Sequence, residues 1–344
     1  MSTQLDKLVE SLDIEQNIYI QVHKIPDPDA LSSALGIKHL LETRNIHAEI
    51  VYKGRASKSV SRMKELLHPI NVINLDKEEI NPIKSSDNII YVDCQYGSSN
   101  VSNIGGTPTA CIDHHQIHKK FNYKFADIRS NVGACATIVY NWFIECNEPL
   151  PPNIASALLY GIKIDTLEMT RGVSKLDLEA YSELHKIADL DKMQELQKNS
   201  RDFEDVLSFR EALRNIYISN RVCYTYMGFN KKNEVMAEIS EFLLDLGDID
   251  FVVAFTDVMN GIRFSIRSAT PNLNAGEIAS EVLETIGNGG GHPHMAGGFA
   301  ESIHFINLPD TTAKMKFIID KFDEKIQEKL TNNLILDNKI TQVN

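Results

Sequence analysis

The chain lacks a cysteine pattern, a long apolar run and an excess of positive charge, and each absence removes a class of protein. Its five cysteines are scattered through 344 residues with no CxxC pair. This distribution argues against a disulfide framework or a thiolate zinc site and favours free, mostly buried thiols in a reducing compartment. We therefore predict a cytoplasmic protein.

No stretch approaches the roughly 20 consecutive apolar residues that a membrane-spanning helix needs. The first residues, MSTQLDKLVESLDIEQN, are polar and mildly acidic, so we expect no signal peptide and no membrane partner. The net charge of −12, from 35 basic and 47 acidic side chains, disfavours a surface that tracks long nucleic acid by neutralising its phosphates. It leaves room for a short anionic substrate that metal ions hold locally.

What is present indicates an α/β protein of two domains. In the first half, short apolar strands are predicted at residues 17–23, 47–52, 71–75, 88–92 and 108–112, and helices at 30–44, 57–67, 133–146 and 153–164. This alternation predicts a mostly parallel, doubly wound sheet. In the second half, strands at 220–227, 251–256 and 262–267 and helices at 235–246, 275–286 and 312–330 predict a smaller α/β domain with a mixed sheet. Met259-Asn260-Gly261 predicts a hairpin between the last two strands.

The pattern of predicted strands and helices changes near residue 200. We predict a first domain over residues 1–190, a charged helical linker over 191–214 and a second domain over 215–344. The active-site cleft is expected between the two domains. A homodimer is the default expectation for the assembly.

Acidic and imidazole side chains gather at four points, each directly after a predicted apolar strand or at the end of a helix. They are the segment HKIPDPD from His23 to Asp29, then Asp93, then Asp113-His114-His115, and finally Asp165. Each alone has an ordinary explanation, such as a solvated turn, a surface pair of histidines or a helix cap at Asp29. Four such clusters are much harder to explain by chance, because strand ends of α/β sheets are where ligands bind.

Carboxylate and imidazole donors in this ratio suit Mn²⁺ or Mg²⁺ better than zinc, which favours thiolates. Carboxylates gathered without a counter-charge would repel one another and raise their pKa values. Two divalent ions that share a bridging carboxylate remove this repulsion, and such pairs commonly serve displacement at phosphorus. The sequence therefore predicts two divalent metal ions, with Mn²⁺ as the preferred ion and Mg²⁺ as the alternative.

With these motifs the chain resembles the DHH phosphoesterases, in the branch of nano-RNases, pAp phosphatases and RecJ-type nucleases. HKIPDPD matches the first motif of that family (His-x-x-x-Asp-x-Asp), VDC the second, DHH the third and GIKIDT the fourth. In the second half, GNGGGHPHMAGGFA resembles the glycine-rich signature of the DHH-associated C-terminal domain, and FSIRS supplies the Arg and Ser that accompany it. Six motifs in order cover nearly the whole chain.

The resemblance implies a role for each matching residue. One ion would be bound by His23, Asp27 and Asp93. The second would be bound by Asp29, Asp93, His114 and Asp165, with Asp93 as the bridge. Asp93 would share catalysis with His115, which steadies the scissile phosphate or assists the leaving group, and with Asp113, which orients an imidazole or the backbone from behind the ligands. Substrate would be bound by Arg267, Ser268, Gly289, Gly290, Gly291 and His292.

The chain departs from this pattern at two places. Pro28 stands where relatives commonly carry a small residue, and Pro removes a backbone donor. Residues 130–134 (SNVGA) replace a segment that is often richer in Ser and Thr. Cys94 follows the bridging carboxylate, and we interpret it as a core residue, since a nucleophilic thiol needs an electropositive setting.

These features predict a manganese- or magnesium-dependent phosphoesterase acting on short RNA or other small nucleotides. The candidate substrates are oligoribonucleotides of a few residues, linear dinucleotides of the pApA or pGpG type, and 3′-phosphoadenosine 5′-phosphate. One alternative is a pyrophosphatase or polyphosphatase, against which the GGGH segment and Arg267 argue, because the resemblance gives that branch a different C-terminal domain. The other is a nucleotide-binding sensor without turnover, whose hallmark would be a lost ligand.

Overall fold

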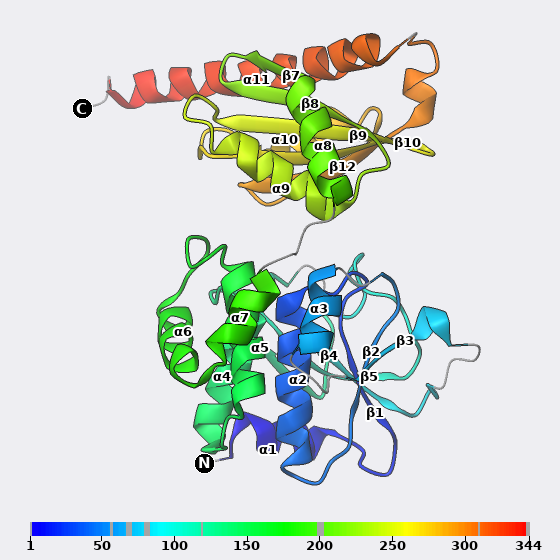
Figure 1. Ribbon diagram of the computed structural model, residues 1–344, viewed down its shortest axis with the longest axis vertical. Helices are drawn as coiled ribbons and strands as arrows, with labels where there is room; N and C mark the ends of the chain where they lie inside the picture. The colour runs from blue at the N-terminus through cyan, green and yellow to red at the C-terminus, as the bar shows by residue number, and fades with distance from the viewer. Residues whose placement is uncertain are drawn as a thin grey trace. The chain divides into compact units, whose positions relative to one another are not determined.

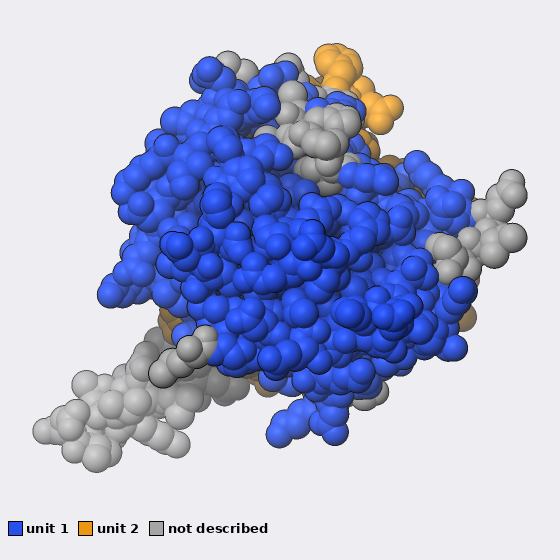
Figure 2. Space-filling model, turned by 90° about the horizontal axis from the view of Figure 1, so that it is seen from below, with its two compact units in different colours: residues 1–200 blue, residues 201–344 orange. Residues whose placement is uncertain are grey.

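The computed structural model describes residues 2–55, 58–66, 71–78, 83–117, 120–197, 203–308 and 310–341. The chain divides into two compact units, residues 1–200 and residues 201–344, which Figure 2 colours separately. Each unit is built around its own six-stranded sheet, shown with its helices in Figure 1. Among the described residues, no helix is both long enough and apolar enough to span a membrane.

The first unit contains a parallel sheet with the order β3-β2-β1-β4-β5-β6. Its strands are β1 (Ile18–Gln21), β2 (Glu49–Tyr52), β3 (Val72–Asn74), β4 (Asn88–Val92), β5 (Thr107–Asp113) and β6 (Phe125–Ile128). Its helices are α1 (Gln4–Ser11), α2 (Pro28–Glu42), α3 (Lys58–Leu66), the 3-10 turn η1 (Leu75–Lys77), α4 (Cys135–Cys146), α5 (Pro152–Asp165), α6 (Lys175–Ile187) and α7 (Leu190–Gln197). The predicted doubly wound parallel sheet is confirmed, and the strand order reverses between β1 and β4, the point where such sheets bind ligands.

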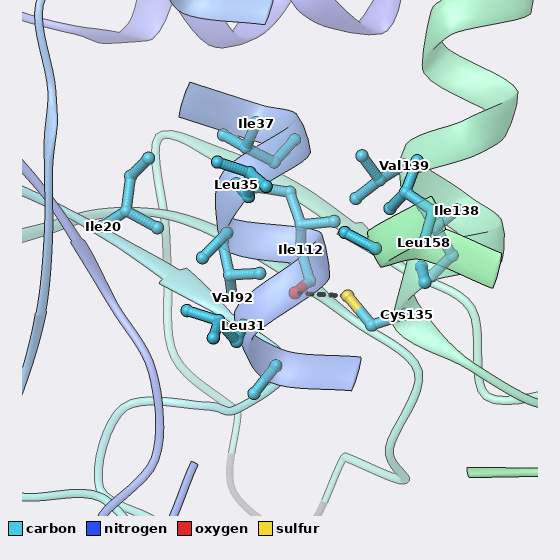
Figure 3. Close-up of a cluster of buried hydrophobic side chains, with 14 of the residues drawn as sticks. Ile20, Leu31, Leu35, Ile37, Val92, Ile112, Cys135, Ile138, Val139 and Leu158 are labelled. Atoms are coloured by element: carbon cyan, nitrogen blue, oxygen red, sulfur yellow. Dashed lines mark hydrogen bonds between the residues drawn. The ribbon is translucent and has the colours of Figure 1, made fainter. Parts of the chain in front are cut away.

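One face of this sheet packs against α2, α4 and α5. Figure 3 shows Ile20, Val92 and Ile112, from three neighbouring strands, against side chains of these helices. The Cys135 thiol lies in the same layer and donates to the carbonyl of Ile112 at 3.5 Å. Continuous burial on both faces explains why β1 and β4 are apolar without alternation.

The opposite face of the sheet holds a smaller apolar cluster. Tyr19, Tyr91 and Cys111 project from the strands and pack with Cys94, which is 3% exposed. Burial raises the pKa of the Cys94 thiol well above its ordinary value, and the nearby acidic groups raise it further. Cys94 is therefore a core residue and a poor nucleophile, as its setting in the sequence suggested.

The second unit contains a mixed sheet with the order β11-β12-β10-β9-β8-β7, in which β8 and β9 are parallel. Its strands are β7 (Ile216–Ser219), β8 (Val222–Phe229), β9 (Phe251–Val258), β10 (Gly261–Ser268), β11 (Gly287–Gly291) and β12 (Met295–Glu301). Its helices are α8 (Phe203–Arg214), α9 (Asn233–Leu244), α10 (Ala275–Leu283), the 3-10 turn η2 (Ser302–Phe305) and α11 (Thr311–Thr341). The predicted mixed sheet and the predicted hairpin between β9 and β10 are confirmed.

Three differences from the predicted elements stand out. Strand β6 was not predicted, since an aspartate interrupts its short apolar pattern (FADI). The glycine run, where no strand was predicted, is the edge strand β11, paired antiparallel with β12. The predicted linker over 191–214 holds most of α7, which belongs to the first unit, and all of α8, which belongs to the second.

Candidate functional site

The carboxyl ends of three adjacent strands carry the histidines and one central carboxylate. His23 lies two residues beyond β1, Asp93 directly follows β4, and His114 directly follows β5. Because β4 pairs with both β1 and β5, these side chains meet at one edge of the sheet. Asp93 has a left-handed backbone with φ of 57°, a conformation that Asp tolerates better than most residues, and its N–H donates to the carbonyl of Ile112 at 2.9 Å.

Two helix ends bring the remaining carboxylates to the same place. Asp27 is the N-cap of α2 and accepts the N–H of Ala30 at 2.9 Å, so the cap considered for Asp29 belongs to Asp27 instead. Pro28 occupies the first helical position, where its missing N–H costs nothing, which accounts for the departure at this position. Asp29 then points inward and is buried, and Asp165 ends α5.

The six predicted metal ligands form two overlapping groups. Nε2 of His23 lies 3.6 Å from an oxygen of Asp27 and 3.6 Å from Oδ2 of Asp93. Nε2 of His114 lies 3.4 Å from Oδ1 of Asp93, 3.3 Å from Asp165 and 3.9 Å from Asp29. Within each of the groups His23/Asp27/Asp93 and Asp29/His114/Asp165, the ligand atoms all lie within 4.8 Å of one another. Asp93 directs one oxygen towards each histidine, which is the geometry of a bridging carboxylate.

The charges of this cluster are unbalanced without a cation. Burial, together with the neighbouring carboxylates Asp93 and Asp165, raises the pKa of Asp29 well above its ordinary value. Burial raises the pKa of Asp165 to about 6 against the opposing effect of His114. Burial also disfavours the charged form of Asp93, but the neighbouring imidazoles of His114 and His23 hold its pKa below the ordinary value. Asp93 Oδ1 is buried without a hydrogen-bond partner among the described residues, so this donor set fits divalent ions.

The imidazoles compensate for part of this negative charge. Burial would lower the pKa of His23, but the adjacent carboxylates of Asp27 and Asp93 outweigh it and raise that pKa to about 10. For His114, burial is outweighed by Asp93 and the other surrounding carboxylates, which raise the pKa to about 11. In the metal-free protein, the protons on these two rings therefore supply positive charge that bound metal ions would otherwise supply.

Asp113 lies behind the ligands. Its Oδ1 accepts the N–H of His114 at 2.8 Å and lies 2.8 Å from Nδ1 of His115, while Oδ2 accepts from Gln95 at 2.8 Å. Asp113 is fully buried and belongs to none of the metal-compatible groups among the described residues. Nδ1 of His114 faces the carbonyl of Val132 at 3.2 Å, which favours a proton on Nδ1 and leaves Nε2 for a metal.

His115 has the most exposed side chain of the Asp113-His114-His115 triplet, with 45% of it exposed. Burial lowers its pKa, but the hydrogen bond to Asp113 and the charge of Asp93 raise it overall. Nδ1 of His115 lies 3.7 Å from Asp93, so this ring also satisfies the distances of a ligand group with Asp93 and His114. Its exposure and its bond to Asp113 suit a group that meets substrate.

Asp29 has a second function that the sequence did not reveal. Its two carboxylate oxygens accept the N–H groups of Cys135 and Ala136, at 2.7 and 2.8 Å, in the first turn of α4. The N-cap residue of α4, Ala134, makes no side-chain cap of its own. Asp29, which belongs to α2, thus caps α4 in place of a local side chain, and the dipole of α4 stabilises its negative charge. This contact explains how the SNVGA segment dispenses with Ser and Thr at that place.

Two further residues hold the ligands in position and were missed because their partners are remote in sequence. Asp177, buried at the start of α6, accepts the N–H of Gly133 at 2.9 Å and the hydroxyl of Thr137 at 2.6 Å. Gly161 of the GIKIDT motif lets α5 approach α2, since a Cβ there would lie 2.3 Å from the Ser32 hydroxyl and 3.1 Å from Cα of Asp29. Asp177 thus fixes the start of α4, whose N–H groups bind Asp29, and Gly161 sets how closely α2, which carries Asp29, approaches α5.

In the second unit, part of the predicted substrate set lines a pocket of about 550 Å³. Arg267, Gly289 and Gly290 line it, whereas Ser268 closes a turn by accepting the N–H of Thr270 and donating to its carbonyl. The glycine run continues to Gly291 and to His292, whose N–H donates to the carbonyl of Met295 at 2.7 Å and joins β11 to β12. Pocket residues that the sequence did not reveal include Arg263, Asn233, Asn288 and Phe299.

Comparisons with known proteins divide the chain in the same way. The N-terminal domain of the DHH family matches residues 17–162, and the DHHA1 domain matches residues 219–328. An uncharacterized protein of Methanocaldococcus jannaschii is 28% identical over 316 residues, 90% of this chain and 63% of that protein. A probable manganese-dependent inorganic pyrophosphatase of Lactobacillus delbrueckii is 29% identical over 173 residues, 49% of this chain and 54% of that protein.

Among solved structures, an exopolyphosphatase-related protein from Bacteroides fragilis superposes with a TM-score of 0.74 at 16% identity. The superposition covers 95% of this chain and 97% of that one, and it shows a shared fold. The chain spans between about half and two thirds of the length of the two curated relatives described above.

Proposed function

The chain belongs to the DHH family and carries a C-terminal DHHA1 domain, and from this premise we propose that it is a metal-dependent phosphoesterase that hydrolyses short nucleotide substrates. The observation that supports the proposal best is the position of Asp93, with one carboxylate oxygen near His23 and the other near His114. A carboxylate shared in this way is what a two-ion hydrolytic centre requires.

We assign the ions to the two ligand groups in the first unit. His23, Asp27 and Asp93 would hold one, and Asp29, Asp93, His114 and Asp165 would hold the other. Bound there, divalent ions supply positive charge to the phosphoryl oxygens and an activated water. Mn²⁺ is the proposed ion, since one similar protein is a probable manganese-dependent pyrophosphatase and the donors here are carboxylates and imidazoles.

The protein's own residues then position the substrate and the protons. His115, held by Asp113 and partly exposed, would contact the scissile phosphate and give a proton to the departing oxygen. Asp113 keeps the ring oriented and stabilises its charged form. Burial of Asp93 and Asp29 keeps water from weakening these interactions.

The proposed substrates are oligoribonucleotides of a few residues, linear dinucleotides such as pApA and pGpG, and 3′-phosphoadenosine 5′-phosphate. The arginine-bearing pocket in the second unit supports a nucleotide rather than a bare phosphate. Hydrolysis of pyrophosphate is the second candidate, supported by the similarity to pyrophosphatases, but that similarity covers only about half of the chain. A non-catalytic sensor finds less support, since every predicted ligand is present. We also propose a cytoplasmic setting, in keeping with the five free cysteines.

The test is a panel of substrates offered to the full chain with Mn²⁺: pApA, pGpG, a five-nucleotide RNA, 3′-phosphoadenosine 5′-phosphate and pyrophosphate. We expect mononucleotides or adenosine monophosphate to be released and Asp93→Ala to abolish the release. Asp248→Ala is the matched control, because that carboxylate is fully exposed in the second unit. Turnover of pyrophosphate alone would contradict the proposal, and binding without turnover would favour the sensor.

A further inference from the structure

Strand β10 presents two arginines to the pocket of the second unit. Arg263, Ser265 and Arg267 alternate along the strand, so they share one face, and all three line the pocket. At the rise of an antiparallel strand, the Cα atoms of the two arginines lie about 13 Å apart. The pocket is therefore lined by two arginines four residues apart on β10, with the hydroxyl of Ser265 between them in the strand.

The guanidinium of Arg267 is largely engaged by the protein. Its Nε donates to Glu241 at 2.5 Å, and its Nη1 donates to the carbonyl of Ile266 at 2.9 Å and to the Ser265 hydroxyl at 3.4 Å. Glu241 also offsets its charge. Arg267 consequently offers a substrate at most its Nη2, a single donor nitrogen.

Arg263 is held differently. Its Nη1 donates to Oδ1 of Asn233 at 3.0 Å and more weakly to the carbonyl of Lys231 at 3.4 Å. Among residues that the structure describes, no carboxylate pairs with it, and its Nε and Nη2 make no hydrogen bond. These two nitrogens form the side-on fork of a guanidinium, which recognises a pair of adjacent acceptors.

Beside the two arginines, Gly290 and Gly297 line the floor of the pocket with backbone that carries no side chain. A Cβ added at Gly297 would meet only the carbonyl of Phe264, at 3.6 Å, and one at Gly290 would meet nothing within 4 Å. At the Arg263 end, the apolar side chain of Phe299 stands opposite Arg263 across the β10–β12 pair, and Asn288 faces Phe299 across the β11–β12 pair. A flat group can lie on such a floor, with an aromatic ring and amide groups beside it.

We propose that Arg263 reads the base of the bound nucleotide and favours guanine. This inference rests on the proposed function. With the phosphate end of the substrate at Arg267 and Ser265, the base of the nucleotide would lie further along β10, near Arg263. The fork of Arg263 matches O6 and N7 of guanine, whereas the N6 amino group of adenine would oppose one of its donors.

The test compares pGpG with pApA on the full chain with Mn²⁺, in the wild type and in Arg263→Gln. We expect the wild type to favour pGpG by about 10-fold or more, mainly through KM, because a bidentate base contact discriminates by roughly 1–3 kcal/mol. Gln pairs with N6 and N7 of adenine, so Arg263→Gln should shift the preference towards pApA. Arg214→Gln, an exposed arginine at the end of α8, is the matched control and should keep the wild-type ratio.

Binding of GMP and AMP by calorimetry gives a readout that does not depend on turnover, and it should show the same inversion. An equal loss for both dinucleotides in Arg263→Gln would overturn the inference and assign Arg263 to a phosphate. An unchanged ratio in that variant, or a wild type that hydrolyses both dinucleotides equally, would overturn it while leaving the proposed function intact. A wild type that neither binds nor hydrolyses either dinucleotide would overturn the inference, and it would overturn the proposed function as well if the five-nucleotide RNA and 3′-phosphoadenosine 5′-phosphate were also left intact.

Discussion

Asp113 holds His115 through a contact of 2.8 Å between its Oδ1 and the imidazole Nδ1. The same oxygen accepts the N–H of His114, so one carboxylate fixes both the backbone after β5 and the ring that extends from it. Asp113 can do this because it is fully buried and its other oxygen is bonded to Gln95. The three adjacent residues of the Asp-His-His triplet thus differ in what they contact.

We expect Asp113→Asn to keep two Mn²⁺ ions per chain and to lose activity by about 10- to 100-fold, the range typical of groups that orient metal-site residues. Metal content by elemental analysis and kcat with a dinucleotide substrate would measure the two effects. His114→Ala is the contrasting variant, and it should lose metal. Loss of metal from Asp113→Asn would place Asp113 among the ligands and contradict our assignment.

Binding of Mn²⁺ should release protons. The pKa values of His23 and His114 are raised to about 10 and about 11, so both rings carry protons at neutral pH in the metal-free protein. A metal ion requires neutral imidazoles, and the apparent affinity should therefore rise with pH. Calorimetric titrations in buffers of different ionisation enthalpy would count the protons, and an affinity that falls as pH rises would contradict the prediction.

The metal-free protein should also become less stable as pH rises from about 6.5 towards 10. A histidine whose pKa is higher in the folded chain stabilises the fold below the unfolded pKa, and this contribution is lost as pH rises through the folded value. The buried carboxylate Asp29 acts in the same direction, because burial penalises its charged form. Thermal unfolding with a chelator, compared with unfolding in Mn²⁺, would show the difference, since bound ions replace the protons.

Gly161→Ala should destabilise the first unit by roughly 1–3 kcal/mol, the usual cost of overpacking a tight contact. The added methyl would press on Ser32 and on the backbone of Asp29, so Mn²⁺ affinity should fall as well. Urea unfolding and metal titration would measure both. Gly247→Ala is the matched control, because a Cβ there meets nothing within 4 Å, and an equal effect of both substitutions would contradict the explanation.

Asp177→Ala should cost roughly 2–4 kcal/mol in the free energy of unfolding, because the N–H of Gly133 and the hydroxyl of Thr137 would lose a buried acceptor. Ser174→Ala removes only the cap of α6 and should cost about 1 kcal/mol. Urea denaturation of the two variants would measure both losses in the free energy of unfolding. Since Asp177 supports the turn that donates to Asp29, its loss should also weaken Mn²⁺ binding, and equal small changes in both variants would argue against this role.

Gly297→Val should fill the pocket of the second unit without disturbing the fold, since a Cβ at this position has room. We expect KM for dinucleotides to rise by about tenfold, equivalent to about 1.4 kcal/mol of binding. Hydrolysis of bis(p-nitrophenyl) phosphate, which has no nucleotide to place in the pocket, should change little. A parallel loss on both substrates would indicate damage to the metal centre or to folding.

The sequence by itself determined the fold class and marked the residues that the structure brings together in the proposed metal site. Apolar strands without alternation predicted a parallel sheet. His23, Asp93 and His114 could be recognised because each is a polar residue that directly follows an apolar strand in the sequence. The hairpin between β9 and β10 was likewise visible in the Met-Asn-Gly turn.

Only the tertiary structure decided which residues support these ligands. The cap that Asp29 gives to α4, the contact of Gly161 with Asp29 and the bond from Gly133 to Asp177 join segments that are far apart in the chain. The same holds for the engagement of Arg267 by Glu241 and of Arg263 by Asn233. Such pairings depend on how helices and strands pack, and no local pattern of apolar and charged residues encodes them, so they become visible only once the chain is folded.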